Sequence, residues 1–128
     1  MITKFKLFEN KKWPYDHLDK NFLFRYLDNG TLTLKQYLDD GGDPNYKNEF
    51  TGLYLFYWLI MRFKQKNNLE TKDDIFYFLS KNPDLTIKYE GSDFFDYVDD
   101  DLKQEIIEKL PDVWNKYLRE KQAKKFNI

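Results

Sequence analysis

The chain contains no cysteine, which excludes disulfide bonds, thiolate catalysis and zinc sites with cysteine ligands. It contains one histidine, so a histidine-rich metal site is excluded and a Ser–His–Asp triad would have to use His17. None of the five glycines stands in a phosphate-binding loop of the Gly-x-Gly-x-x-Gly or Gly-Lys-Ser/Thr type. Because no nucleophile motif accompanies His17, the sequence predicts a protein that is not an enzyme and that needs no cofactor.

The chain also has no large excess of charge of one sign, because 21 Lys and Arg residues balance 22 Asp and Glu residues, for a net charge of −1. This balance argues against bulk electrostatic attraction to nucleic acid or to a membrane surface. The longest apolar run, residues 53–61, ends at Arg62 and is shorter than the roughly 20 residues of a membrane span. Lys4, Lys6 and Glu9 interrupt the N-terminus, so no signal peptide is expected. We therefore expect a cytoplasmic protein that is monomeric by itself.

Aromatic residues are abundant, at 20% of the 128 residues, beside 34% charged residues. Such a chain has the length of one domain and enough apolar side chains to repay the entropy of folding. The simplest interpretation is that large rings fill a small core. The alternative is that surplus rings form a surface that binds another molecule.

Apolar residues recur at the spacing of helices along most of the chain, which predicts an all-α fold. We expect about three antiparallel helix pairs with an extra C-terminal helix. The single domain, 1–128, divides into an N-terminal arm (1–12), a helical stack (13–118) and a frayed basic tail (119–128). The helices are expected at residues 15–28, 32–40, 53–64, 94–98, and after caps at Thr71, Asp101 and Asp112.

Residues 37–49 and 78–90 resemble each other, and Asp43 aligns with Asp84 at an offset of 84 − 43 = 41 residues. Each segment ends a helix-like stretch with turn residues, and each is followed by a glycine and an apolar run. A glycine at 41 or 42 supplies the left-handed conformation that ends a helix. Pro44 keeps Asp43 out of a helix, which favours a turn at this point.

The turn Gly41-Gly42-Asp43-Pro44-Asn45 and the helix start Gly52-Leu53-Tyr54-Leu55 resemble the ankyrin repeat family, over roughly residues 34–110. Neither copy has the family's Thr-Pro-Leu-His motif, and the 41-residue offset exceeds the usual period of about 33. The resemblance implies an irregular ankyrin-like stack in which the loops after each turn and the adjacent helices bind a protein partner.

A small chain with few repeats also looks like a dedicated inhibitor or an immunity protein. Tyr46 and Ile87 align, and in an alternative interpretation they pack beneath the loops, which makes Phe50 and Tyr89 the better surface candidates. The candidate partner-binding residues lie on the two loops: Tyr46, Lys47, Phe50, Lys88, Tyr89 and Glu90.

Three other functions stay open at this point. The acidic cluster Asp96, Asp99, Asp100 and Asp101 offers oxygen ligands for a divalent metal in a hydrolase or nuclease, although helix capping explains it more simply. The basic tail, with Arg119 and three lysines, would suit a nucleic-acid accessory protein. A self-assembling structural protein is the third.

Overall fold

The structure, a computed structural model, describes residues 13–126, so the expected arm (1–12) lies outside it. Every regular element in this part of the chain is a helix, which confirms the all-α class. The elements are a 3-10 helix, η1 (Lys20–Phe22), and the α-helices α2 (Leu23–Asn29), α3 (Leu34–Asp39), α4 (Leu55–Lys66), α5 (Leu69–Leu79), α6 (Phe94–Tyr97), α7 (Asp100–Lys109) and α8 (Pro111–Phe126).

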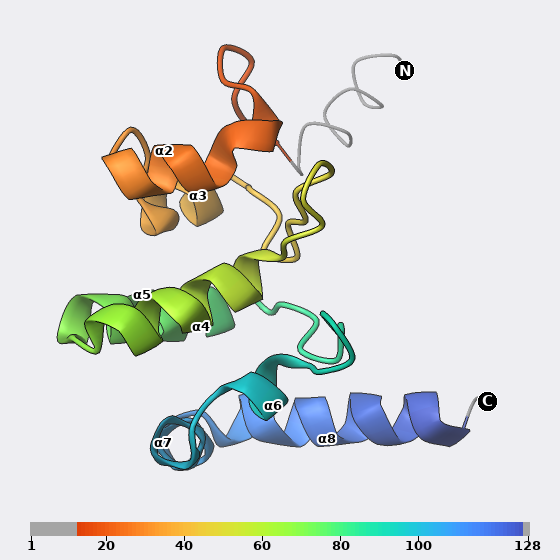
Figure 1. Ribbon diagram of the computed structural model, residues 1–128. Helices are drawn as coiled ribbons and strands as arrows, with labels where there is room; N and C mark the ends of the chain where they lie inside the picture. The colour runs from red at the N-terminus through yellow and green to blue at the C-terminus, as the bar shows by residue number, and fades with distance from the viewer. Residues whose placement is uncertain (1–12, 127–128) are drawn as a thin grey trace.

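The helices are arranged in layers (Figure 1). The first layer contains α2 and α3, the second contains α4 and α5, and the third contains α6, α7 and α8. The first and second layers meet where α3 packs on α5. The second and third layers meet where α4 packs on α6. Because each short helix buries only one face within its own layer, the core lies between layers.

The third layer differs from the other two. In Figure 1 α7 is seen end-on, whereas α4, α5 and α8 lie across the view, so α6 and α7 do not repeat the side-by-side pairing of α4 with α5. Helix α7 instead packs against α8. The chain therefore forms two clear helix pairs and a third group with a different geometry.

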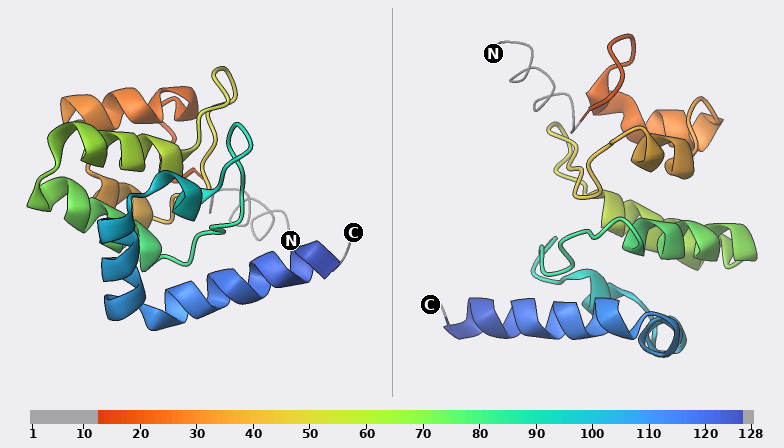
Figure 2. Two further views of the ribbon diagram at one scale, coloured as in Figure 1. Left: turned by 60° about the horizontal axis from the view of Figure 1, so that its bottom comes forward. Right: turned by 180° about the vertical axis from the view of Figure 1, so that it is seen from behind.

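The segments between layers project beyond the helices as two loops on the same side of the molecule (Figures 1 and 2). We name them finger 1 (residues 43–54) and finger 2 (residues 84–93). Each finger contains one isolated antiparallel β-bridge, between Lys47 and Tyr54 in finger 1 and between Tyr89 and Ser92 in finger 2. The fingers follow α3 and α5, as the sequence predicts.

Helix α4 is the centre of the core. Five of its side chains are buried, and three more, Tyr57, Trp58 and Met61, are half-buried and pack against the core. An isolated helix with apolar residues on nearly every side would be unstable in water, so neighbours must cover it. Each fully buried Leu, Ile or Phe side chain contributes roughly 1.5–3 kcal/mol. The largest fully buried apolar side chains are Tyr37, Phe78, Phe94, Leu23, Leu55, Leu59, Ile60, Ile75, Leu79 and Ile106.

Several helix starts differ from those predicted. The helix expected from Tyr15 begins only at η1, and α3 and α4 each begin two residues later than expected. Helix α5 begins earlier, because Asn68 accepts a hydrogen bond from the backbone N–H of Thr71 (2.9 Å). Thr71 is thus the third residue of the helix and completes a capping box instead of being the cap.

Two further caps were assigned to the wrong residue. Asp99, not Asp101, caps α7 by accepting from the N–H of Leu102 (2.7 Å). Pro111 ends α7 and also begins α8, with Asp112 in the first turn, because proline suits the first position of a helix. In each case neighbouring residues can cap equally well, and packing of the following apolar side chains selects between them.

Helix α8 continues to Phe126, so the expectation of a frayed tail from residue 119 is wrong over the described residues. Side chains of α8 contact elements far away in sequence. Tyr117 is buried, and its hydroxyl donates to Asp93 (2.8 Å), while Lys124 pairs with Asp84 (3.5 Å). These contacts attach α8 to finger 2, and its many Lys, Arg, Glu, Gln and Ala residues also favour a helix.

Candidate partner-binding surface

Finger 1 is held in place by two buried polar residues. The Tyr46 hydroxyl donates to the carbonyl of Lys20, and burial raises the pKa of Tyr46, so the hydroxyl stays protonated. The Asn48 side chain donates to the carbonyl of Asn21 (2.7 Å) and accepts from the N–H groups of Phe50 (2.9 Å) and Thr51 (3.0 Å). Backbone hydrogen bonds between positions 48 and 53 and between 52 and 48 close the loop. Finger 1 is therefore a fixed turn.

The tip of finger 1 carries Phe50, whose side chain is 78% exposed. An exposed ring is unusual for a residue of this size, and the turn beneath it is ordered by Asn48. Lys47, also exposed, lies over the ring of Tyr54 with its ammonium 5.5 Å from the ring centroid. The finger thus displays an apolar group and a cation on a defined backbone.

Finger 2 ends in a tight turn in which Tyr89 and Ser92 exchange both backbone hydrogen bonds (2.8 and 3.2 Å). Its two central residues, Glu90 and Gly91, have φ values of 52° and 86°. These angles define a type I′ turn, in which asparagine and glycine are the favoured residues. The backbone of a glutamate is strained at this position. The strain lowers the stability of the turn, and the turn itself does not require a glutamate.

An aromatic face connects the two fingers. The Tyr89 ring of finger 2 lies 4.6 Å from Tyr57 and 6.4 Å from Tyr54, and Tyr57 lies 5.0 Å from Tyr97 of α6. The Tyr97 hydroxyl donates to the carbonyl of Tyr89 (2.6 Å). All four rings are half-buried, so each is held on one side and accessible on the other.

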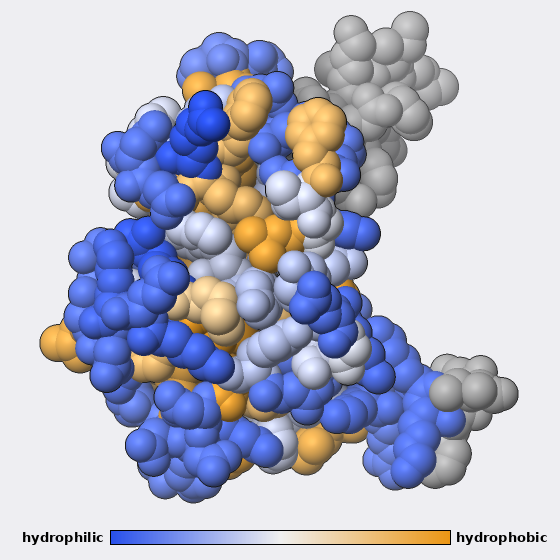
Figure 3. Space-filling model, in the orientation of Figure 1, coloured by the Kyte–Doolittle hydropathy of each residue, from blue (hydrophilic) through white to orange (hydrophobic). Residues whose placement is uncertain are grey.

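The same face extends to the first layer, where Phe24 of α2 stacks on Trp58 of α4 at 5.6 Å. Arg62 lies over Trp58 (5.1 Å) and pairs with Asp28 (3.2 Å). Figure 3 views the molecule from the side of α2, α4 and α6, and it shows weakly hydrophilic and hydrophobic side chains along the middle of this side, between strongly hydrophilic edges. We name the aromatic face by its residues: Phe24, Tyr54, Tyr57, Trp58, Tyr89 and Tyr97.

The predicted site residues divide into three groups. Lys47, Phe50, Lys88 and Glu90 are exposed on the fingers, and Tyr89 is half-buried between them and the helices. The prediction of Tyr46 as a partner-binding residue needs correction, because Tyr46 is only 7% exposed. It anchors finger 1 and offers no surface to a partner. The alternative interpretation of Tyr46 as a residue beneath the loop describes what the structure shows.

Sequence reasoning missed the helical half of this surface. Tyr54 and Tyr57 are three residues apart at the start of α4, and Trp58 follows directly. This spacing places side chains on one side of a helix, and it was interpreted only as core. The high proportion of tyrosine was the available signal, because a ring with a polar hydroxyl suits a half-buried position.

The acidic cluster does not form a metal site in the described residues. Asp99 caps α7, and the Asp96 carboxylate accepts from the backbone N–H of Asp93 (2.9 Å), which lowers the pKa of Asp96. Within residues 13–126 no three His, Cys, Asp or Glu side chains are grouped so that they could hold a metal ion. Helix capping accounts for the contacts of Asp96 and Asp99.

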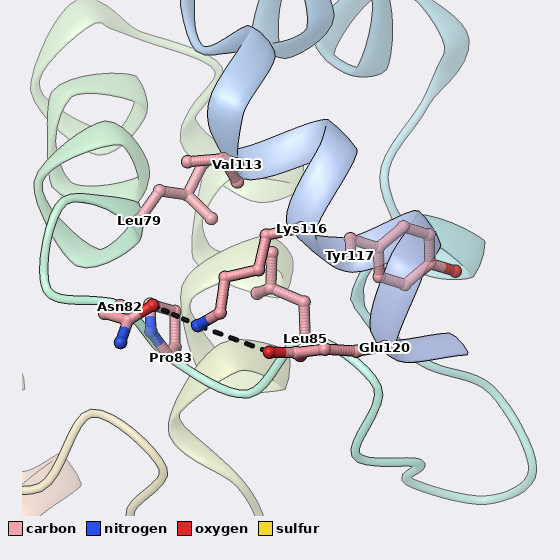
Figure 4. Close-up of a pocket in the computed structure, with 8 residues that line it drawn as sticks. All are labelled: Leu79, Asn82, Pro83, Leu85, Val113, Lys116, Tyr117 and Glu120. Carbon is pink, nitrogen blue, oxygen red and sulfur yellow. Dashed lines mark hydrogen bonds and ion pairs between the residues drawn. The ribbon is translucent and has the colours of Figure 1, made fainter. Parts of the chain in front are cut away.

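His17 is exposed in the loop before η1, and no hydrogen bond of the described residues joins its ring to a hydroxyl or a carboxylate. The hollow between α5, the following loop and α8 has a volume of about 20 Å³. Figure 4 shows Lys116 lying across it, between Asn82 and Glu120 (3.4 Å to the carboxylate). Such a volume admits about one water molecule, so this hollow does not accommodate an organic substrate.

Comparisons of the chain with protein-family models, with curated proteins and with solved structures gave no match. Between residues 13 and 126, no helix combines the length and the apolar character needed to cross a membrane. The function must therefore be argued from the surface described above.

Proposed function

We propose that this protein is a non-catalytic protein-binding domain whose contact surface consists of the two fingers and the aromatic face. Phe50 carries the proposal, because its exposed ring stands on a turn that Asn48 holds in place. A large apolar side chain on an ordered backbone loses little entropy on binding, and such residues dominate the affinity of interfaces. Covering part of a cognate partner is how an inhibitor or immunity protein acts, and this is the role we propose.

We also propose that the stack is a diverged relative of the ankyrin repeat. The proposal is supported by the order of helix pair, turn and finger, which occurs twice, and by the projection of both fingers on one side of the helices (Figure 2). It is further supported by Gly41, which follows α3 and has the positive φ (97°) expected of a glycine that ends a helix. Rigid stacks of this kind present an extended surface that suits protein recognition.

Site-specific photo-crosslinking tests the proposed surface. A benzoylphenylalanine at position 50 should form an adduct with one partner protein in cells that make this chain. The matched control is the same amino acid at position 69, because Leu69 is also apolar and 74% exposed, yet it begins α5 at the opposite end of the helices from the fingers. Adducts that are the same from both positions, or none from position 50, would overturn the proposal.

The affinity for the partner identified in this way gives the second test. Phe50→Ala should weaken binding by about tenfold or more, since removing a central interface residue costs more than roughly 1.4 kcal/mol. Leu69→Ala should leave the Kd within about twofold, because an isolated apolar residue outside the interface contributes little. Both exposed positions tolerate alanine, so circular dichroism should show unchanged folding. An unchanged Kd for Phe50→Ala would reject the assignment of this surface.

A further inference from the structure

A groove lies between finger 2 and the C-terminal half of α8. Its volume of about 700 Å³ exceeds that of the hollow beside finger 1, about 430 Å³. It falls in the range of sites that bind ligands in proteins, about 300–1,000 Å³. Finger 2 contributes Thr86, Lys88 and Asp93 to this groove, whereas no residue of the aromatic face or of the Phe50 turn lines it.

The groove is strongly basic. Four lysines line it, Lys88, Lys121, Lys124 and Lys125, against a single carboxylate, Asp93, which is 1% exposed. Lys121 lies 3.7 Å from Asp93 and Lys124 lies 3.5 Å from Asp84, so these two charges are partly compensated. Lys88 and Lys125 have no carboxylate within 4.0 Å among the residues that the structure describes. They leave positive charge for a ligand.

The walls of the groove are held together by buried polar contacts. The Tyr117 hydroxyl donates to Asp93 (2.8 Å) and accepts from Lys121 (3.0 Å), which also raises the pKa of Lys121. On the other side Lys124 donates to Thr86, whose hydroxyl in turn donates to Asp84 (2.6 Å). These contacts fix finger 2 and α8 relative to each other, and these two elements carry Lys88 and Lys125, so a ligand meets a preformed groove at a lower entropy cost.

The groove also has an apolar point, because Leu118 of α8 lines it and is 43% exposed. Among the residues whose side chains the structure describes, those that line the groove include no aromatic ring, whereas grooves that bind single-stranded nucleic acid stack bases on aromatic rings. Because Asp84 and Asp93 compensate two of the lysines, the groove offers little uncompensated positive charge for a continuous row of phosphates. Discrete acidic side chains with an apolar residue between them fit this pattern better.

We infer that the groove between finger 2 and α8 binds an acidic segment of a protein, with carboxylates on Lys88 and Lys125 and an apolar side chain on Leu118. The inference rests on the proposed function in taking the ligand to be a polypeptide. It names a second contact region, on a different element from Phe50, and the two can be tested separately.

The test uses the full chain and a fluorescent peptide of glutamates with a central leucine, followed by anisotropy at low and at about 150 mM ionic strength. The variant Lys88→Glu/Lys125→Glu should weaken binding by about tenfold or more, because two favourable contacts become repulsive. The matched control is Arg119→Glu/Lys66→Glu, which makes the same change in net charge at exposed positions outside the groove. The two double variants are also matched in their effect on helix ends, because each replaces one lysine in the last turn of a helix, Lys125 in α8 and Lys66 in α4.

The control should bind the peptide within about twofold of the unmodified chain. Equal losses in both double variants would indicate unspecific attraction and overturn the inference. Tighter binding of a single-stranded DNA probe, lost in the groove variant alone, would overturn it in favour of nucleic acid. Leu118→Ser should weaken only the leucine-containing peptide and not a peptide of glutamates alone. Because Phe50→Ala should bind the peptide normally, failure of the proposed function would be recognised separately.

Discussion

Glu90 occupies a left-handed backbone conformation in which asparagine or glycine would be more stable. Nothing in the turn of finger 2 requires a carboxylate, since the hydrogen bonds between Tyr89 and Ser92 are made by the backbone. Residues held in such conformations are concentrated at functional sites. At Glu90 the stability of the turn and the proposed binding of a partner are therefore expected to oppose each other.

We expect Glu90→Asn to raise the free energy of unfolding by about 0.5–1 kcal/mol, because it relieves the strained φ of the type I′ turn. Glu90→Gln removes the same charge without relieving the strain, so its stability should match that of the unmodified chain. Urea denaturation of the three proteins measures the difference. Equal stability of the Asn and Gln variants would show that the turn stores no strain.

Gly42 is needed for space and not for its backbone angle. A Cβ atom at this position would lie 2.2 Å from the ring of Tyr37. This ring is fully buried, and the Tyr37 hydroxyl donates to the carbonyl of Asp43 (2.8 Å). We expect Gly42→Ala to lower the free energy of unfolding by about 1–3 kcal/mol, as overpacked cores do. Thermal denaturation tests this. A neutral or stabilising effect would mean that the Tyr37 ring moves aside without loss.

At the scale of elements, the fingers owe their shape to single polar side chains that reach other elements. Asn48 connects finger 1 to the start of the first layer through Asn21, and Asn45 accepts from the backbone N–H of Asp84 (2.8 Å), which connects the two fingers. A loop fixed in this way can display Phe50 in one orientation. This is the physical basis of the proposed surface.

Asn48→Ala should lower the free energy of unfolding by about 1–3 kcal/mol, because it leaves the carbonyl of Asn21 and two N–H groups of finger 1 without partners. Glu49→Ala, at the exposed neighbouring position, should change it by less than about 1 kcal/mol. Hydrogen exchange of finger 1 gives a local readout. Protection that is the same in both variants would contradict the role of Asn48.

Helix α8 shows how an element can be ordered by its surroundings. Phe95 of α6 contacts Trp114 (5.0 Å) and Tyr117 (4.6 Å), and these rings attach the first half of α8 to the third layer. The lysines that follow are then placed along finger 2. The order of α8 is what turns a basic stretch of sequence into one wall of a groove.

At the scale of the whole molecule, the layers are joined by ion pairs as well as by the core. Lys72 of α5 pairs with Glu105 of α7 (2.9 Å), and Arg62 of α4 pairs with Asp28 of α2 (3.2 Å). Hydrogen bonds from Lys72 and Lys109 lower the pKa of Glu105, and that of Asp96 is lowered by its backbone partner. Exposed or partly exposed pairs of this kind contribute modestly at neutral pH.

These lowered pKa values predict loss of stability in acid. A carboxyl whose folded pKa lies below its unfolded value, about 3.9 for Asp and 4.3 for Glu, stabilises the fold above that value. The contribution disappears as the pH falls through the folded pKa. Asp74 opposes this trend weakly, because burial raises its pKa. The free energy of unfolding should therefore be nearly constant from about pH 5 to about pH 9 and should fall toward pH 3.

Glu105→Gln should reduce this dependence and cost about 0.5–1 kcal/mol at neutral pH, because the pair with Lys72 is lost. Urea denaturation at a series of pH values measures both effects. Stability that stays constant from pH 5 to pH 3 in the unmodified chain would contradict the assignment of these pairs.

The sequence by itself determined the features that depend on near neighbours. Helical periodicity predicted the all-α class, and the glycines at 41 and 42 predicted where one helix ends, since α3 ends at Asp39 and Gly41 has a positive φ. The positions of the two loops followed from the turn residues of the two similar segments, 37–49 and 78–90. The partner-binding role of Phe50 and Glu90 stays a prediction, but their exposure is a property of the structure.

Only the tertiary structure decided which residues face inward and which long segments are ordered. Tyr46 lies beneath finger 1, where its hydroxyl reaches Lys20, 26 residues away, and α8 is attached to finger 2 by Tyr117, whose hydroxyl reaches Asp93, 24 residues away. Contacts over such separations leave no local pattern in the sequence. The half-buried tyrosines of the aromatic face could not be predicted for the same reason. A tyrosine suits both the core and the surface, and only the packing of the folded chain decides which of the two it occupies.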